Sequence, residues 1–234
     1  MEIFGTLTGP LLLIPFLLPL SYLFWRHVWF FRNPSRRVPP GEHILSPADG
    51  TVVYVKQVPA HAPVISVKRH RVLSIADIVR EDLNEIKLLI GIFMSPFDVH
   101  YNRAPISGQV EFIRHHPAVL KNHHMGSMHW RSILRRHPIY EHSSHLIHNE
   151  RTVTQISGVF KGDPLSCYVV QIAGGSVRGV ESWVDTGHRV EQGQVFGMIR
   201  VGSQVDLVVT WKQAMSVKVK PGDRVYAGES ILIE

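Results

Sequence analysis

The chain has little cysteine, few acidic residues and no charged residue between Ile3 and Trp25. Cys167 is the only cysteine among 234 residues, which excludes an intramolecular disulfide. Lysine and arginine (25) outnumber aspartate and glutamate (19), and the net charge of +6 favours an anionic partner, either nucleic acid or anionic lipid. No Gly-Lys-Ser/Thr follows Gly174-Gly175, so this glycine pair predicts a turn and not a phosphate cradle.

The stretch from Ile3 to Trp25 carries no charged residue, and its length would let a helix cross a bilayer. Three prolines interrupt it, but membrane helices tolerate proline better than helices in water do. A basic and aromatic border follows, of the kind that lies among lipid headgroups. We therefore predict that residues 1–33 are a membrane anchor, made of an N-terminal membrane helix and a basic and aromatic interface segment. The basic side and the rest of the chain would lie on the cytoplasmic face of the cell membrane. A buried core helix is the alternative.

Two other interpretations of this region are disfavoured. A signal peptide would need a positive segment before the apolar run and a small-residue cleavage site after it, and neither is present. A nucleic-acid partner is disfavoured because the positive charge lacks interleaved aromatic residues and lies beside the apolar stretch. The expected partner is therefore an anionic membrane surface.

The remainder of the chain predicts a mainly β (α+β) fold. A linker rich in proline and arginine, residues 34–41, precedes a domain over 42–234. Apolar runs predict strands, including one over Lys87–Met94. Val184–Gln194 and Val219–Glu229 share the pattern V-x-x-G-x-R-V-x-x-G-x, similar to the hairpins of lipoyl and biotinyl carriers. This lipoyl-like hairpin repeat favours a barrel or sandwich, and the lysine that such carriers modify is not found.

Several polar positions stand out against this β pattern. Gly202-Ser203 lies inside an apparent strand, where glycine usually marks a bulge or a close backbone approach. Asp49 lies in an Asp-Gly turn, and His100 and Arg103 lie in the loop that follows Lys87–Met94.

Nine histidines lie between His115 and His148, mixed with arginines. Their spacing matches no metal motif, so no metal site is assigned there. We expect a solvated basic loop, in contact with anionic membrane.

Six motifs occur in an order that resembles the phosphatidylserine decarboxylase family. The resemblance is to the short form, which has an N-terminal membrane segment and a compact β domain. Each motif is weakly specific, whereas the ordered series is specific and spans residues 30–207. The motifs are Phe30-Phe31-Arg32-Asn33-Pro34-Ser35-Arg36, Ser46-Pro47-Ala48-Asp49-Gly50, Asp98-Val99-His100-Tyr101-Asn102-Arg103-Ala104-Pro105, Asn149-Glu150-Arg151, Gln171-Ile172-Ala173-Gly174 and the run from Phe196 to Leu207.

This resemblance implies a zymogen that makes its own covalent cofactor, a pyruvoyl group. Ser203 would attack the Gly202 carbonyl, and elimination would leave a β chain (1–202) and an α chain (203–234) held together as a heterodimer. The pyruvoyl group derived from Ser203 would form a Schiff base with an aminophospholipid substrate and serve as the electron sink while CO₂ departs. The implied reaction converts phosphatidylserine to phosphatidylethanolamine.

The resemblance also implies an Asp-His-Ser arrangement for self-cleavage, in which a carboxylate orients the base. Asp49 matches the aspartate, and His100 is the candidate base or proton donor. Longer family members carry a second histidine three positions on, where this chain has Arg103. Arg103 is a candidate for binding the substrate phosphate or carboxylate, and a solvated loop arginine is the alternative.

Two other functions stay open. One is decarboxylation of archaetidylserine, which has a different lipid backbone. The other is a non-enzymatic, membrane-tethered β-sandwich, which would leave the position of Gly202-Ser203 unexplained.

Overall fold

The computed structural model describes residues 5–59, 63–67, 71–74, 85–118, 121–134, 145–175, 179–200 and 202–234. The chain divides into two compact units, residues 1–34 and 35–234. In the first unit, helix α1 (Gly5–Phe24) continues into a short π-helix, η1 (Trp25–Trp29). Within the described part of the chain, no helix is both long enough and apolar enough to cross a membrane, so the predicted membrane-spanning helix is not supported.

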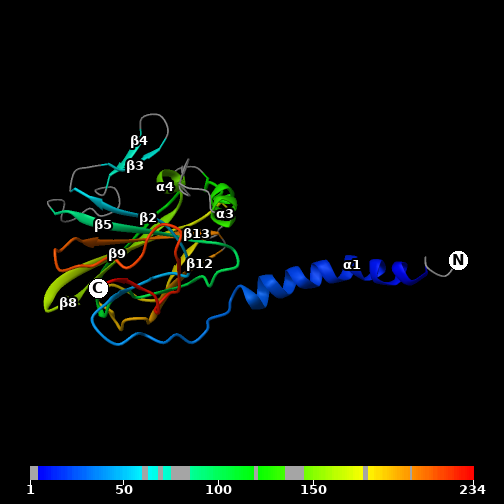
Figure 1. The fold of residues 1–234 in the computed structure, drawn as a ribbon, viewed down its shortest axis with the longest axis horizontal. Coiled ribbons are helices and arrows are strands. Elements are labelled where there is room, and N and C mark those ends of the chain that lie inside the picture. Colours follow the sequence, from blue (N-terminus) through cyan, green and yellow to red (C-terminus); the bar gives the residue numbers. More distant parts are fainter. Residues whose placement is uncertain are drawn as a thin grey trace. The chain divides into compact units, whose positions relative to one another are not determined.

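The second unit is mainly β, as predicted, and is built around a twisted antiparallel sheet in the order β11-β7-β8-β9-β13-β5-β2-β14. Figure 1 labels β8, β9, β13, β5 and β2 of this sheet. Its strands are β2 (Gly50–Val58), β5 (Lys87–Met94), β7 (Gly108–His116), β8 (Arg151–Phe160), β9 (Asp163–Ile172), β11 (Arg189–Val190), β13 (Ser203–Thr210) and β14 (Arg224–Val225).

Three smaller sheets and two helices complete the described part of this unit. They are β1 (Ile44–Leu45) with β15 (Ile231–Ile233), β10 (Val180–Ser182) with β12 (Val195–Ile199) and β6 (Tyr101–Arg103), β3 (Pro63–Val67) with β4 (Arg71–Ser74), and helices α3 (Gly126–Ile133) and α4 (His145–His148).

The central strands of the large sheet, β5 and β13, are buried on both faces because their side chains alternate between two apolar cores. On β13, Val205 and Leu207 point into the larger core, which the smaller sheets help to enclose. Val208 points into the second core, where Met125 and Met128 from the α3 region cover the sheet. This explains why β5, beside β13 in the centre of the sheet, is buried along its whole length and does not alternate with polar residues.

The repeat recognised in the sequence forms two equivalent turn–strand–turn units at opposite edges of the sheet, through β11 and β14. Gly187 donates to the Val110 carbonyl at 2.7 Å, and Gly222 donates to the Val52 carbonyl at 2.8 Å. Both glycines have a positive φ, 89° and 99°, which explains why each copy needs glycine at this turn.

Four neighbouring strands bring distant sequence segments to one end of the sheet. Ser203 on β13 lies opposite Met94 on β5, and Gln204 lies opposite Ile172 on β9. β2 begins beside this end at Gly50, since its next residue pairs with Phe93. The segments before and after these strand ends include most of the family-like motifs, so the register places the candidate site here.

Candidate active site

Gly202-Ser203 lies at a junction between two sheets and not inside one strand. The preceding strand, β12, belongs to the three-stranded sheet and ends at Ile199, whereas β13 starts at Ser203 in the large sheet. Gly202 has a φ of +64°, and a Cβ added there would meet no atom within 4 Å. Backbone conformation, and not crowding, therefore favours glycine before this serine. Val201 lies outside the described residues.

The Ser203 hydroxyl is fully buried, and in the part of the chain that the structure describes its Oγ has no hydrogen-bond partner. Its side chain lies on the face that carries Met94 and Val205, in the larger core. A buried hydroxyl without a partner costs about 1–3 kcal/mol of stability. Such groups are rare in folded proteins and call for an explanation such as a chemical role.

His100 is buried and lies near the same end of the sheet. Its carbonyl accepts a hydrogen bond from the Ile199 amide at 3.2 Å, three residues before Gly202. Its Nδ1 lies 2.9 Å from the Asp98 carbonyl. Because a carbonyl only accepts, Nδ1 carries the proton and the basic lone pair of the neutral ring is on Nε2. This tautomer suits a general base.

Asp49 is buried but its carboxylate is engaged elsewhere. Oδ2 accepts from the Arg36 guanidinium at 2.7 Å, and Oδ1 accepts from the Ala227 amide at 2.8 Å. Burial raises the pKa of Asp49, against the Ala227 amide and Arg36, which lower it. The structure therefore does not show Asp49 orienting His100; the backbone carbonyl of Asp98 holds the ring instead.

Arg103 lies where the two repeat copies meet. Its guanidinium donates to the Gly193 carbonyl at 2.8 Å, and its side chain packs against Gly228, the equivalent glycine of the second copy. The side chain is half-buried. These contacts hold the Arg103 side chain between the two repeat copies, and its role in binding substrate stays a prediction.

A cavity of about 180 Å³ opens beside Gly202. Its walls contain apolar groups from β5 and the loop after it, together with two histidines from the segment that the sequence suggested was a solvated loop. The lining residues are Phe93, Pro96, His124, Met125, Gly126, His129, Gly175 and Gly202. The expectation of a wholly solvated loop is therefore wrong for residues 121–134, because Met125 and Met128 are buried in the second core. Residues 135–144, including His142, lie outside the described part.

Asn149 fastens this histidine-bearing segment to the sheet. Its side-chain amide donates to the His123 carbonyl at 2.9 Å and to the Ala173 carbonyl at 2.6 Å. Its Oδ1 accepts from the His123 amide at 2.7 Å. Sequence patterns alone assign no role to the Asn149-Glu150-Arg151 motif. In the structure, Asn149 holds the cavity wall in place.

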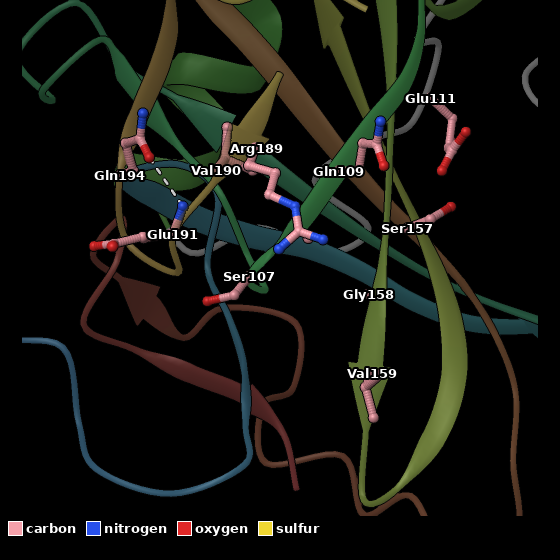
Figure 2. A pocket seen from close by; sticks show the side chains of 11 residues that line it. Ser107, Gln109, Glu111, Ser157, Gly158, Val159, Arg189, Val190, Glu191 and Gln194 are labelled. Atoms are coloured by element: carbon pink, nitrogen blue, oxygen red, sulfur yellow. Dashed lines mark hydrogen bonds between the residues drawn. The ribbon is translucent and has the colours of Figure 1, made fainter. Parts of the chain in front are cut away.

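A larger concavity, of about 810 Å³, lies elsewhere on the sheet and contains none of the predicted site residues. Figure 2 shows the Arg189 side chain extending toward its middle, with Glu191, Gln194 and Gln109 around it. Gly158 lines this concavity and lies on β8, seven residues from Arg151. Arg151 pairs with Ile172 at the end of the sheet where the candidate site lies. At about 3.3 Å per residue the two ends are roughly 20 Å apart.

Within the described residues, no group of three histidine, cysteine, aspartate or glutamate side chains is arranged to hold a metal ion. The histidine-rich segment contributes to two other features in this region. His124 and His129 line the cavity beside Gly202, and His145 is buried with a hydrogen bond to Gln204.

Comparison with known proteins gives the same family from independent matches. The family model described as phosphatidylserine decarboxylase matches residues 23–233. A putative archaetidylserine decarboxylase proenzyme of Methanocaldococcus jannaschii is 35% identical over 206 residues, covering 88% of this chain and 87% of its own length. Phosphatidylserine decarboxylase proenzymes of Amoebophilus asiaticus (31% identical; 88% and 73% covered) and Carboxydothermus hydrogenoformans (33%; 90% and 80%) are also similar.

Proposed function

Because the chain belongs to the phosphatidylserine decarboxylase family, whose members are lyases, we propose that it cuts itself between Gly202 and Ser203 and then converts phosphatidylserine to phosphatidylethanolamine. One observation supports the bond between Gly202 and Ser203 as the site of cleavage. A glycine at a φ of +64° precedes a buried serine whose Oγ has no hydrogen-bond partner in the described structure, at the edge of a cavity. A nucleophile held next to a flexible carbonyl is what the self-cleavage requires.

In the proposed cleavage, Ser203 Oγ loses its proton and attacks the Gly202 carbonyl carbon, and the peptide nitrogen becomes a free amine. The resulting ester then loses the Ser203 Cα proton, and the C–O bond breaks with the Gly202 carboxylate leaving. Water adds to the remaining enamine in its imine form and ammonia departs, which leaves a pyruvoyl group at residue 203. His100 is the proposed base, because its Nε2 is the basic nitrogen and the loop that carries it is bonded to Ile199.

A pyruvoyl group at residue 203 would supply the carbonyl that takes up the electron pair left when CO₂ departs. The protein would supply binding and protons. His124 and His129 in the cavity wall are suited to an anionic headgroup, since each ring N–H donates a hydrogen bond. Phe93 and Met125 would exclude water around the reacting carboxylate, and loss of its charge is favoured in a dry site.

The intact mass of the purified protein tests the cleavage. We expect two chains, ending at Gly202 and beginning with a pyruvoyl group at residue 203, and a Ser203→Ala variant that remains one inactive chain. A wild-type protein that stays uncut under all conditions and releases no CO₂ would overturn this function. That result would instead favour a non-enzymatic β-sandwich.

Archaetidylserine is a second candidate substrate, because a relative that is 35% identical is described as a putative archaetidylserine decarboxylase. Both lipids carry the same serine headgroup and differ in the backbone that bears the hydrocarbon chains. The rate of CO₂ release from each lipid in matched micelles separates the two. A kcat/KM ratio above about tenfold in favour of archaetidylserine would reassign the substrate.

We further propose that the protein works at the surface of the cell membrane, on its cytoplasmic side. A lipid substrate requires contact with a bilayer, and Phe16 (74% exposed) and Leu18 (66%) are among the apolar side chains that α1 leaves open to solvent. The basic residues after α1 would favour anionic lipid. Flotation of the Ser203→Ala protein with vesicles tests this: co-flotation with anionic vesicles and not with neutral ones is expected, and failure to float with either would refute it.

A further inference from the structure

Gln204 follows Ser203 and points to the opposite face of the sheet. Successive side chains of a strand alternate, so Ser203 lies in the larger core while Gln204 and Asp206 lie on the side of the second core. Gln204 is also the first residue of β13 paired on both sides, opposite Phe93 on β5 and Ile172 on β9. Among the described strands, Ser203 pairs with Met94 alone, so the position that would bear the cofactor is held by the ladder on one side.

Four buried side chains form what we call the Gln204 network: Tyr54, His145, Gln204 and Asp206, each at most 3% exposed. His145 Nε2 lies 3.0 Å from Gln204 Oε1. Gln204 Nε2 donates to the Tyr54 hydroxyl at 2.8 Å and to Asp206 Oδ1 at 2.7 Å. Tyr54 in turn donates to Asp206 Oδ2 at 2.8 Å.

One assignment of protons satisfies this network. Both N–H groups of the Gln204 amide are used as donors, so its Oε1 must accept from His145, which is then neutral with its proton on Nε2. Burial lowers the pKa of His145 to about 4, which keeps the ring neutral near pH 7. Asp206 accepts two hydrogen bonds as a carboxylate. A buried polar network in which every one of these bonds is made holds its members in one arrangement.

The network joins the two sides of the proposed cut. Tyr54 and His145 belong to residues 1–202, and Gln204 and Asp206 belong to residues 203–234. Before cleavage, the peptide bond to Gly202 helps to hold residue 203. After cleavage that bond is gone, and residue 203 becomes the end of a strand, where chains fray.

Resting on the proposed function, we propose that the Gln204 network positions the new N-terminus of β13 after self-cleavage, so that residue 203 keeps its place at the start of the strand. Gln204 is thus a positioning residue, because it acts through the residue beside it. A misplacement of about 1 Å at a reacting group can cost on the order of 100-fold in rate. The network therefore matters for turnover more than for cleavage or substrate binding.

The test compares Gln204→Ala with wild type and with Gln155→Ala. Gln155 is a buried glutamine on β8 that bonds Ser166 at 3.1 Å, outside the network. Self-cleavage is followed by denaturing gel, and kcat and KM are measured on phosphatidylserine in micelles. We expect Gln204→Ala to be cleaved, with kcat about 10- to 100-fold lower and KM within about threefold of wild type. Gln155→Ala should keep kcat within about threefold.

Hydrogen exchange on the cleaved proteins gives a second readout. Gln204→Ala should raise exchange in residues 204–206 and leave β8 unchanged, whereas Gln155→Ala should not affect residues 204–206. Tyr54→Phe removes one hydroxyl of the network and keeps the shape of the side chain. If Gln204→Ala does not fold, kcat and hydrogen exchange can be measured on Tyr54→Phe instead. It should lower kcat about three- to tenfold.

The outcomes separate the two proposals. A wild-type protein that is not cleaved at Gly202-Ser203 overturns the proposed function and the positioning role with it. A cleaved, active wild type whose kcat is unchanged in both Gln204→Ala and Tyr54→Phe, or falls equally in Gln155→Ala, overturns the positioning role alone.

Discussion

The Arg36 guanidinium donates to the Asp49 carboxylate at 2.7 Å, and the two side chains are only 8% and 6% exposed. The same guanidinium reaches Glu229 at 2.9 Å. Arg36 belongs to a motif to which sequence patterns assign no role, and Glu229 lies beyond the proposed cleavage site. Arg36 therefore ties a candidate site residue and the C-terminal segment to the start of the second unit.

Replacing Arg36 by alanine should destabilise the protein by about 3–5 kcal/mol, because it leaves the Asp49 charge buried without its partner. The measurement is urea unfolding in a Ser203→Ala background, which keeps one chain. Lys212→Ala is the control, since Lys212 makes an exposed ion pair with Asp163. It should change the free energy of unfolding by less than about 1 kcal/mol. Equal effects of the two variants would show that the Arg36 pair is not the stabilising contact.

Self-cleavage should depend on His100 more than on Asp49. We expect His100→Ala to slow the cleavage of purified proenzyme by at least about 100-fold, as loss of a general base does. Asp49→Asn should slow it less than about tenfold, because Asp49 bonds Arg36 and Ala227 and not the His100 ring. Equally large effects, measured by time-resolved gels, would mean that Asp49 orients the base during the reaction.

Gly202→Ala should slow cleavage because an alanine at a φ of +64° costs about 1–2 kcal/mol. No atom lies within 4 Å of the added Cβ, so the effect is one of backbone conformation. Gly202→Asn should fall between glycine and alanine, since asparagine tolerates this region better. Gly162→Ala is the matched control: Gly162 has a φ of +81° and equal space, at the turn between β8 and β9. It should lower stability without slowing cleavage.

Replacing His124 and His129 together by alanine should raise KM by about 10- to 100-fold, the effect of losing one charge-assisted hydrogen bond of about 1.5–3 kcal/mol. Self-cleavage should continue at its normal rate, because these rings line the cavity and are not the proposed base. His188→Ala, at an exposed repeat turn, should leave KM unchanged. Slower cleavage with normal KM would assign the two histidines to processing instead.

His145 and Asp206 should give opposite pH dependences of stability. Burial lowers the pKa of His145 from 6.5 to about 4, with a smaller lowering from His123, against the Gln204 bond. Between pH 4 and pH 6.5 the unfolded chain binds a proton that the native state does not, so stability falls as the pH drops.

Burial raises the pKa of Asp206 from 3.8 to about 6, although Gln204, Tyr54 and Arg151 lower it. Here the native state binds the extra proton, so stability rises as the pH drops from about 6 to about 4. Each contribution is roughly 3 kcal/mol, and together they nearly cancel.

Single variants in the Ser203→Ala background should separate the two contributions. Relative to the parent, Asp206→Asn should lose stability more steeply between pH 6 and pH 4, and His145→Gln should lose it less steeply. Urea unfolding at several pH values measures both slopes. Parallel slopes for the two variants and the parent would show that neither group titrates in this range.

Local sequence patterns were sufficient to predict the mainly β fold, several strands and the repeat. Lys87–Met94 was predicted with its exact bounds, because a continuous apolar run is what a strand buried on both faces requires. The repeat was visible because its turn glycines must adopt a positive φ. The ordered series of motifs was sufficient to identify the family without any knowledge of tertiary contacts. The prediction that the N-terminal helix spans a membrane is not supported, although a helix, α1, is present there.

The tertiary structure decided how the side chains of the candidate site are paired. Sequence spacing could not show that Asp49 bonds Arg36, that Arg103 lies between two repeat turns, or that His124 and His129 line a cavity beside Gly202. These contacts join positions between 13 and 125 residues apart. They depend on strand order and register, which local patterns leave open. The sequence identified Gly202-Ser203 as the bond to examine. Only the folded chain showed its place between two sheets, with a buried serine on one face and an anchored glutamine on the other.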